Sequence, residues 1–188
     1  RSTLFPYTTL FRSASVVNCT EDDAMPAVAA IAVDWNGDRQ IFSGQNQYKV
    51  VNVPILDEPA FCLFDLNQQE LSLAVLRNCD CEIIVDAGSW KGETLAFLKK
   101  ASVVISSEEF RDPVGRDIFS IQECASAQKA MTRGEKPIRL DDGEVPVASV
   151  PCVDSLAAGD IFHGAFCFAY YHKQLDFKAA LTFASTIA

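Results

Sequence analysis

The sequence predicts an α/β fold in which helices cover both faces of a mostly parallel β-sheet. From about residue 60 onward, short apolar runs alternate with segments of helical spacing. Acidic or hydroxyl residues follow several of these runs, and residues 153–168 have the pattern of a strand, a tight turn and a helix. Ligands of such sheets bind beyond the carboxyl ends of the strands, so polar residues at those ends are the first candidates for function.

An antiparallel hairpin is expected ahead of the alternating segments, at about residues 27–43. Residues 27–34 form an apolar run, residues 35–38 have a turn composition, and residues 39–43 can return as the second strand. From this pattern alone, the hairpin can equally be an edge of the main sheet.

The α/β core is expected at about residues 60–188. Its strands and helices are predicted at 61–64, 68–77, 83–85, 95–100, 103–105, 117–125 and 176–188. A second hairpin, with strands at 138–140 and 145–147, turns at Asp141, Asp142 and Gly143, whose acids are expected to be solvated. The residues at the strand ends that can face a ligand are Asp65, Asp86, Ser106 and Ser107.

Residues 153–168 carry the pattern with the clearest chemistry. A valine-rich run ends at Asp154, small residues occupy 157–159, and helical spacing follows Asp160. Small side chains at a helix start let an anion approach free backbone N–H groups, which the helix dipole also favours. A carboxylate beside such an anion site suits phosphoryl transfer. The alternative is that Asp160 only caps the helix or stabilises its first turn.

Residues 154–166 resemble the Asp-Thr-x-Gly-Ala-Gly-Asp signature of the ribokinase-like, PfkB-type carbohydrate kinases, with Ser155 in place of the threonine and Ala157 in place of the first glycine. The resemblance implies a three-layer α/β sandwich with a small β lid, which would include the hairpin at 27–43. It also implies ATP-dependent phosphorylation of a sugar or nucleoside hydroxyl group. In that reaction Asp160 would be the base, and the backbone N–H groups of Ala157, Ala158 and Gly159 would form the anion hole.

Three further segments resemble the family more loosely. Thr132 and Gly134 match its Thr-x-Gly nucleotide segment, and Lys91 lies in a strand-end loop where it can face a phosphate. Glu109 matches the acid of the family's Asn-x-x-Glu magnesium motif when Ser106 is aligned with the asparagine. The implied cofactors are ATP and Mg²⁺, with a monovalent cation as a further candidate. Glu109 can also be a solvated acid at a helix N-terminus.

Composition limits the other classes of function. The net charge of −9 argues against a nucleic-acid surface, which requires clustered Lys and Arg, and no apolar run is long enough to span a membrane. The seven cysteines, mostly within apolar patterns, are interpreted as reduced residues of a cytoplasmic protein. Cys79 and Cys81 are too close together for the usual zinc knuckle and only two histidines are present, so a Cys/His metal site is not expected.

Residues 1–13 share no period with the rest, resemble translated sequencing-adapter read-through and are expected to be non-native. Residues 14–188 are then a partial kinase domain, truncated at both ends, inactive by itself and marginal in stability. The expected partner is a small sugar or nucleoside, and the lid can pair two copies as a homodimer. Two alternatives remain: a non-catalytic sugar- or nucleotide-binding protein of the same fold, and an unrelated doubly wound binding domain.

Overall fold

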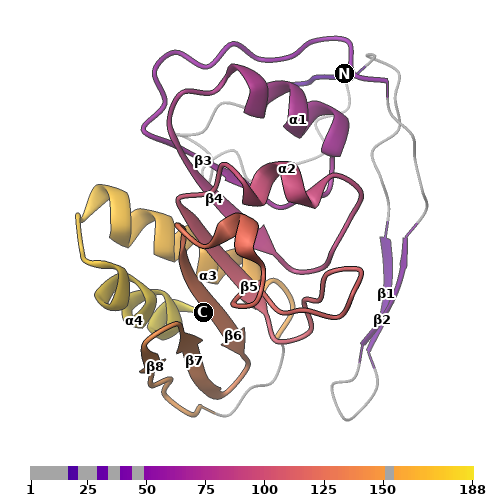
Figure 1. Cartoon of the computed structure of the whole chain (residues 1–188). Helices are drawn as coiled ribbons and strands as arrows, with labels where there is room; N and C mark the ends of the chain where they lie inside the picture. The colour runs from indigo at the N-terminus through magenta and orange to yellow at the C-terminus, as the bar shows by residue number, and fades with distance from the viewer. Residues whose placement is uncertain (1–16, 21–28, 34–38, 44–48, 151–154) are drawn as a thin grey trace, which may run out of the picture.

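The computed structural model describes residues 17–20, 29–33, 39–43, 49–150 and 155–188. The predicted non-native segment 1–13 lies outside these ranges. Within them, a six-stranded sheet with the strand order β3-β4-β5-β6-β7-β8 forms the centre of the molecule (Figure 1). None of the helices in these ranges has the length and apolar character that crossing a bilayer requires.

The first four strands of this sheet are parallel. They are β3 (Phe61–Phe64), β4 (Glu82–Ala87), β5 (Val103–Ser107) and β6 (Gln128–Arg133). The helices α1 (Gln69–Asn78) and α2 (Thr94–Leu98) connect β3 to β4 and β4 to β5. Strands β4 and β5 are buried almost throughout, as continuous apolar runs between two helical layers must be. The predicted strand–helix alternation is confirmed.

Two antiparallel strands extend the sheet, β7 (Lys136–Leu140) and β8 (Gly143–Val145). The turn between them is the predicted one, but its acids are not merely solvated. Asp141 forms an ion pair of 3.1 Å with the buried Lys129, and Asp142 forms one of 3.0 Å with Lys178. Both acids are solvent-exposed, as expected, and their ion pairs also tie the hairpin to β6 and to the last helix.

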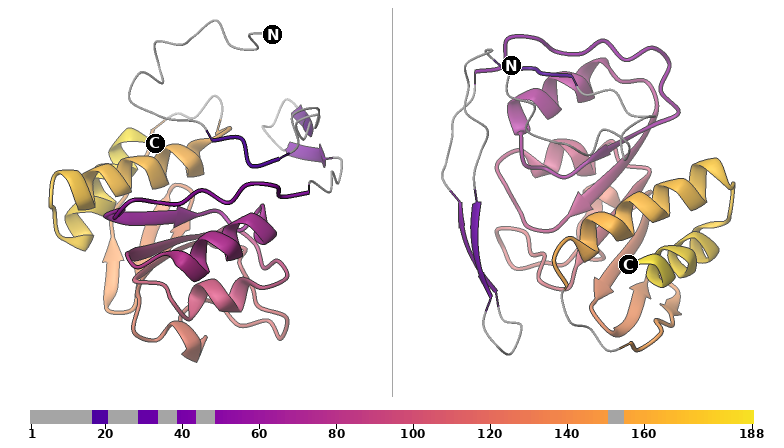
Figure 2. Two further views of the ribbon diagram at one scale, coloured as in Figure 1. Left: turned by 90° about the horizontal axis from the view of Figure 1, so that it is seen from above. Right: turned by 180° about the vertical axis from the view of Figure 1, so that it is seen from behind.

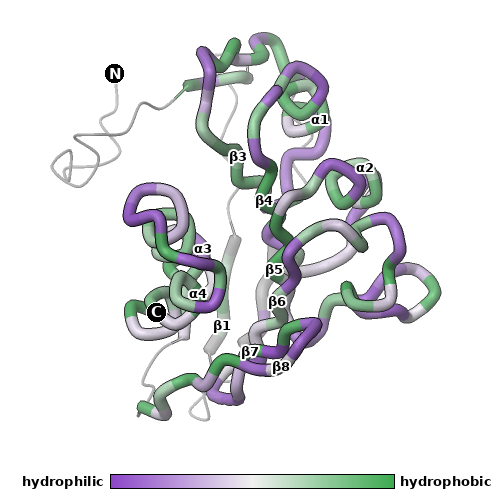
Figure 3. Tube along the Cα trace, turned by 60° about the vertical axis from the view of Figure 1, so that its left-hand side comes forward, coloured by the Kyte–Doolittle hydropathy of each residue, from purple (hydrophilic) through white to green (hydrophobic). Residues whose placement is uncertain are grey.

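Helices cover both faces of the sheet, and Figure 3 shows the two helical layers on opposite sides of the strands. One face packs against α1, α2 and the short 3₁₀ helix η1 (Gln122–Cys124). The other face packs against α3 (Ala158–Cys167), the turn η2 (Phe168–His172) and α4 (Phe177–Ile187), which lie in front of the strands in the right-hand view of Figure 2. Neighbouring residues of β4 alternate between these two cores: Val85 belongs to the first and Ile84 to the second.

The N-terminal hairpin forms a sheet of its own. Strands β1 (Ala29–Val33) and β2 (Arg39–Ser43) pair with each other in antiparallel register, and neither belongs to the six-stranded sheet. Figures 1 and 2 show this two-stranded ribbon standing apart from the α/β core. The arrangement differs from an edge hairpin of the main sheet, which was the alternative left open by the sequence pattern.

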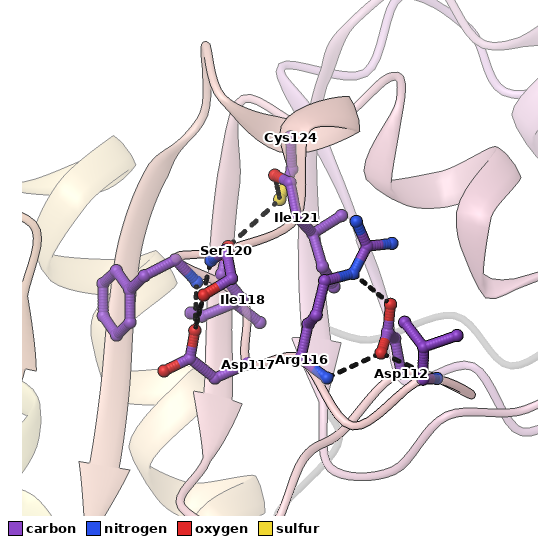
Figure 4. Close-up of polar contacts among 9 residues, drawn as sticks. Asp112, Arg116, Asp117, Ile118, Ser120, Ile121 and Cys124 are labelled. Carbon is purple, nitrogen blue, oxygen red and sulfur yellow. Dashed lines mark hydrogen bonds and ion pairs between the residues drawn. The ribbon is translucent and has the colours of Figure 1, made fainter.

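Two predicted elements are wrong. A strand was expected in the valine-rich run at 145–153, but β8 ends at Val145. Residues 146–150 are irregular, and 151–154 lie outside the described ranges. Pro146 has no backbone N–H and cannot donate to a sheet ladder. The helix expected at 117–125 is reduced to η1. The Asp117 side chain accepts the backbone N–H groups of Phe119 and Ser120 at 3.1 Å, as at a helix start, but the turn ends at Ile121, whose backbone is extended with φ −87° and ψ 112° (Figure 4).

Candidate active site at the carboxyl edge of the sheet

The carboxyl ends of the four parallel strands bring the predicted strand-end residues to one edge of the sheet. Asp65 follows β3, Asp86 lies near the end of β4, and Ser107 is the last residue of β5. Ser107 Oγ donates to the Gly88 carbonyl at 2.9 Å, which joins the loop after β4 to β5. Thr132 Oγ1, near the end of β6, donates to the backbone carbonyl of Ser106 in β5 at 3.2 Å. The strand-end loops therefore form one connected edge.

Asp86 is the electrostatic centre of this edge. Its carboxyl group is largely buried, and this burial is the main reason that its pKa is raised. His163 opposes the rise, the negative charges of Asp65 and Asp160 add to it, and Lys91 again opposes it. Asp86 is therefore the carboxyl group on which the charges of the turn after β3, the loop after β4 and the start of α3 act.

His163 holds the beginning of α3 against the end of β4. Its imidazole is buried, and Nδ1 lies 2.7 Å from the Gly159 carbonyl and 3.4 Å from Asp86 Oδ2. Its Nε2 is buried without a hydrogen-bond partner among the described residues. The sequence did not indicate the contact between His163 and Asp86.

The turn before α3 has the backbone that the family pattern assigns to glycine. Ala157 is the N-cap residue and has the left-handed conformation, with φ 60° and ψ 10°. The Ala158 N–H already donates to the Ser155 carbonyl at 3.2 Å, so it differs from the free anion-hole donor expected from the sequence. Gly159 is open: a Cβ built there would meet no atom within 4 Å. Among the residues that the structure describes, the N–H groups of Ala157 and Gly159 are therefore better candidates for binding an anion than that of Ala158.

Asp160 is exposed in the first turn of α3, as its spacing predicted. A carboxylate is electrostatically favoured there, because the first turn carries the positive end of the helix dipole. The loop beside it contains Lys91, whose Nζ donates to Asn67 Oδ1. Asn67 in turn donates to Asp65 through its side chain at 2.7 Å and its backbone at 2.9 Å. The structure thus places Lys91 at this edge, in contact with the turn after β3.

The predicted nucleotide and magnesium residues lie farther along the same edge. Gly134 begins the two-residue turn between β6 and β7 with φ +61°, so the turn itself requires a glycine there. Lys136, next to that turn, pairs with Glu108 at 3.2 Å, which brings the turn after β5 beside the hairpin. Glu109 is exposed in this turn, which is not a helix N-terminus. Thr132, near the end of β6, therefore lies next to the turn that contains Gly134, and the turn that contains Glu109 lies beside this hairpin.

Ser106, aligned with the asparagine of the magnesium motif, is only 1% exposed. Its Oγ has no hydrogen-bond partner among the described residues. A side chain this deeply buried in β5 cannot take the place of an asparagine that faces the metal and its waters. Two cavities of about 430 and 370 Å³ also lie away from Asp160, one beside the start of α4 and one beside residues 53–56. The candidate site is an exposed edge lined by acids.

No family model and no curated protein matches the sequence. Solved structures do match the fold. The ribokinase of Thermotoga maritima superposes with a TM-score of 0.64 at 20% identity, over 85% of this chain and 60% of that one. The ribokinase of Giardia lamblia superposes with a TM-score of 0.61 at 14% identity, over 85% and 64%. The fructokinase of Vibrio cholerae O395 gives 0.50 at 18% identity, over 86% and 69%.

These superpositions confirm the predicted ribokinase-like α/β fold, with its mostly parallel central sheet between helical layers. The chain spans about 60% of the length of the Thermotoga maritima ribokinase.

Proposed function

We propose that the protein is a ribokinase-like, PfkB-type carbohydrate kinase, which transfers the γ-phosphoryl group of ATP to a hydroxyl group of a sugar or nucleoside. The observation that carries this proposal is the position of Asp160. It is an exposed carboxylate in the first turn of α3, directly after a turn of small residues and at the carboxyl edge of a sheet with the ribokinase fold. Substrates of parallel α/β sheets bind at this edge.

In the proposed reaction, Asp160 accepts the proton of the substrate hydroxyl group as its oxygen attacks the γ-phosphorus. The new O–P bond forms while the bond from the γ-phosphorus to the bridging oxygen breaks, and ADP leaves. The N–H groups of Ala157 and Gly159, at the positive end of α3, stabilise the negative charge on the transferred group. Asp86 and His163 hold this helix end in place through the contacts at 3.4 and 2.7 Å.

The donor groups at this edge fit the proposed cofactors. Mg²⁺ prefers oxygen ligands and commonly binds one or two carboxylates together with substrate phosphates, and this edge supplies carboxylates from Asp86, Asp160 and Glu109. Glu109 is the proposed metal ligand, since it is exposed beside Thr132 and Gly134. A bound Mg²⁺ neutralises charge on the phosphates. Lys91, Thr132 and Gly134 are the proposed nucleotide contacts, and the open space at Gly159 leaves room for a phosphate.

The proposed partner is the small sugar or nucleoside itself, and the proposed compartment is the cytoplasm. All six cysteines in the described ranges are free thiols, as a reducing compartment favours. The separate β1–β2 ribbon is proposed to act as the lid. A ribbon of two strands has unpaired edges, through which two copies can pair as a homodimer.

The test is ATP consumption by the full-length protein with a panel of sugars and nucleosides, before and after Asp160→Asn. Loss of the general base is expected to lower the rate by about 10²- to 10⁴-fold or more, while the urea midpoint of unfolding stays unchanged. Asp57→Asn, at an exposed residue away from this edge, is the matched control and is expected to keep the wild-type rate.

Two outcomes would contradict the proposal. A full rate in Asp160→Asn would show that this carboxylate is not the base. Binding of a sugar or nucleotide by the wild-type protein without any ATP consumption would favour the non-catalytic member of the fold.

A further inference from the structure

Three cysteines meet at the end of the sheet opposite the candidate active site. Cys62 lies in β3, Cys79 directly follows α1, and Cys81 directly precedes β4. The Sγ atoms of Cys62 and Cys79 are 3.3 Å apart, and those of Cys79 and Cys81 are 2.8 Å apart. All three sulfurs lie within 4.8 Å of one another, and all three residues are half-buried.

The β3–α1–β4 crossover produces this meeting. Parallel pairing sets Cys62 opposite Ile83, so the start of β3 lies beside the start of β4. Helix α1 runs back along the sheet and returns the chain to the same end, where Cys79 is extended with φ −96° and ψ 121°. The sequence showed only the close pair Cys79 and Cys81, from which a metal site was not expected. The third sulfur comes from 17 residues upstream of Cys79, and only the fold brings it there.

We propose that Cys62, Cys79 and Cys81 bind one thiophilic metal ion of the Zn²⁺ type through three thiolates, with the fourth position open to solvent. In tetrahedral zinc–thiolate sites, Zn–S distances of about 2.3 Å place the sulfurs about 3.8 Å apart. The separations here, from 2.8 Å to at most 4.8 Å, bracket that value. Small side-chain rotations therefore bring all three sulfurs onto one ion.

The number of sulfurs favours a metal ion over a disulfide. A disulfide joins only two of them and leaves the third as an unused thiol in contact with the bond, whereas one soft ion uses all three. Each thiol that binds releases its proton to the solvent, so three thiolates and one Zn²⁺ leave a net charge of −1 at the site. The half-buried position keeps the fourth coordination position within reach of water.

The bound ion would act as a structural clip. Within the described sheet β3 is an edge strand that pairs only with β4. Coordination would join this strand to the end of α1 and to the start of β4. The clip is independent of the proposed catalysis, because Cys62 and Asp65 lie at opposite ends of β3, about 10 Å apart at the usual rise of a strand.

The test measures Zn²⁺ binding to the reduced protein by equilibrium dialysis and native mass spectrometry, and thiolate coordination by the absorption of Co²⁺ in its place. The expected result is one ion per chain, a charge-transfer band from thiolate to Co²⁺, and a melting temperature that rises with Zn²⁺. Cys62→Ser and Cys81→Ser are each expected to weaken binding at least tenfold and to remove the rise. If Cys62→Ser does not fold, Cys81→Ser in the connecting loop tests the same site.

Cys124→Ser is the matched control. Cys124 is buried elsewhere, and its thiol donates only to the carbonyls of Ile118 and Ile121, which a hydroxyl group can also do. This variant is expected to bind Zn²⁺ as the wild-type protein does. The proposal is overturned if the reduced wild-type protein takes up no Zn²⁺, or if the Cys62→Ser and Cys81→Ser variants bind it as tightly as Cys124→Ser.

Discussion

The left-handed backbone of Ala157 makes a glycine at this position favourable for stability. A residue with a Cβ pays about 1–2 kcal/mol in this conformation, which glycine adopts freely (φ 60°, ψ 10°). Glycine also has more freedom in the unfolded chain, which offsets about 0.4–1 kcal/mol of the gain. At an N-cap, glycine ranks well above alanine, which favours the same substitution. Ala157→Gly is therefore expected to stabilise the protein by about 0.5–1 kcal/mol.

The assay is urea unfolding followed by circular dichroism, with thermal unfolding as a second measurement. For a chain of this length, about 0.5–1 kcal/mol corresponds to a rise in melting temperature of roughly 1–4 °C. The urea midpoint should rise without a change in slope, since the substitution leaves the buried surface unchanged. The residue is exposed, so no packing contact is lost to confuse the result.

Ala158→Gly is the control for this experiment. The same substitution one residue later falls in the first turn of α3, where the backbone φ is not positive. Glycine there gains nothing from the backbone and is expected to destabilise the protein by about 0.5–1 kcal/mol. Equal destabilisation by both substitutions would refute the left-handed conformation of Ala157 and, with it, the explanation of the glycine in the family pattern.

Three further substitutions test the electrostatics of the site and the packing of α4. Burial raises the pKa of Asp86 in the folded state above its value in the unfolded chain, so the folded state binds this proton more tightly. The free energy of unfolding therefore falls as the pH rises from the unfolded pKa through the raised folded pKa. Asp86→Asn should remove that fall, because an amide does not titrate, and an unchanged pH profile would contradict it. Leu181 is a fully buried side chain of α4, so Leu181→Ala should lower the free energy of unfolding in urea by about 2–5 kcal/mol. Ile187 is 55% exposed on the same helix, so Ile187→Ala should change it by less than about 0.5 kcal/mol. Equal effects of the two would show that α4 does not pack on the sheet as described.

Elements with a strong hydrophobic pattern could be predicted from the sequence, and elements decided by single polar contacts could not. The continuous apolar runs of β4 and β5 predict buried strands, because apolar side chains on both faces of a strand must be covered by helices. The segment at 117–125 has helical spacing, yet the extended backbone of Ile121 interrupts it and leaves only η1. Lys129 lies buried in β6 because Asp141, from the next hairpin, neutralises it at 3.1 Å. Neither the extended backbone at Ile121 nor this ion pair has a signature in the local sequence.

The candidate site could likewise be predicted only in part from the sequence. Asp65 and Asp86 could be placed at the same edge from sequence, because parallel strands end together. The contact between Asp86 and His163 could not, since it depends on how closely α3 approaches the end of β4. The meeting of Cys62 with Cys79 and Cys81 likewise required the crossover geometry.

The backbone conformation of Ala157 depends on both local and long-range contacts. Its left-handed backbone costs energy locally, so surrounding contacts must hold the turn in this conformation. Three described contacts can do so. Ala158 N donates to the Ser155 carbonyl at 3.2 Å, Ile161 N donates to the Ala157 carbonyl at 2.9 Å, and His163 contacts both the Gly159 carbonyl and Asp86. The buried pair of Asp86 and His163 therefore fixes the helix start on the sheet, and the same pair brings Asp160 to the edge where the substrate is proposed to bind. A backbone that favours glycine can then tolerate alanine, because the position of the helix is determined by the sheet beneath it.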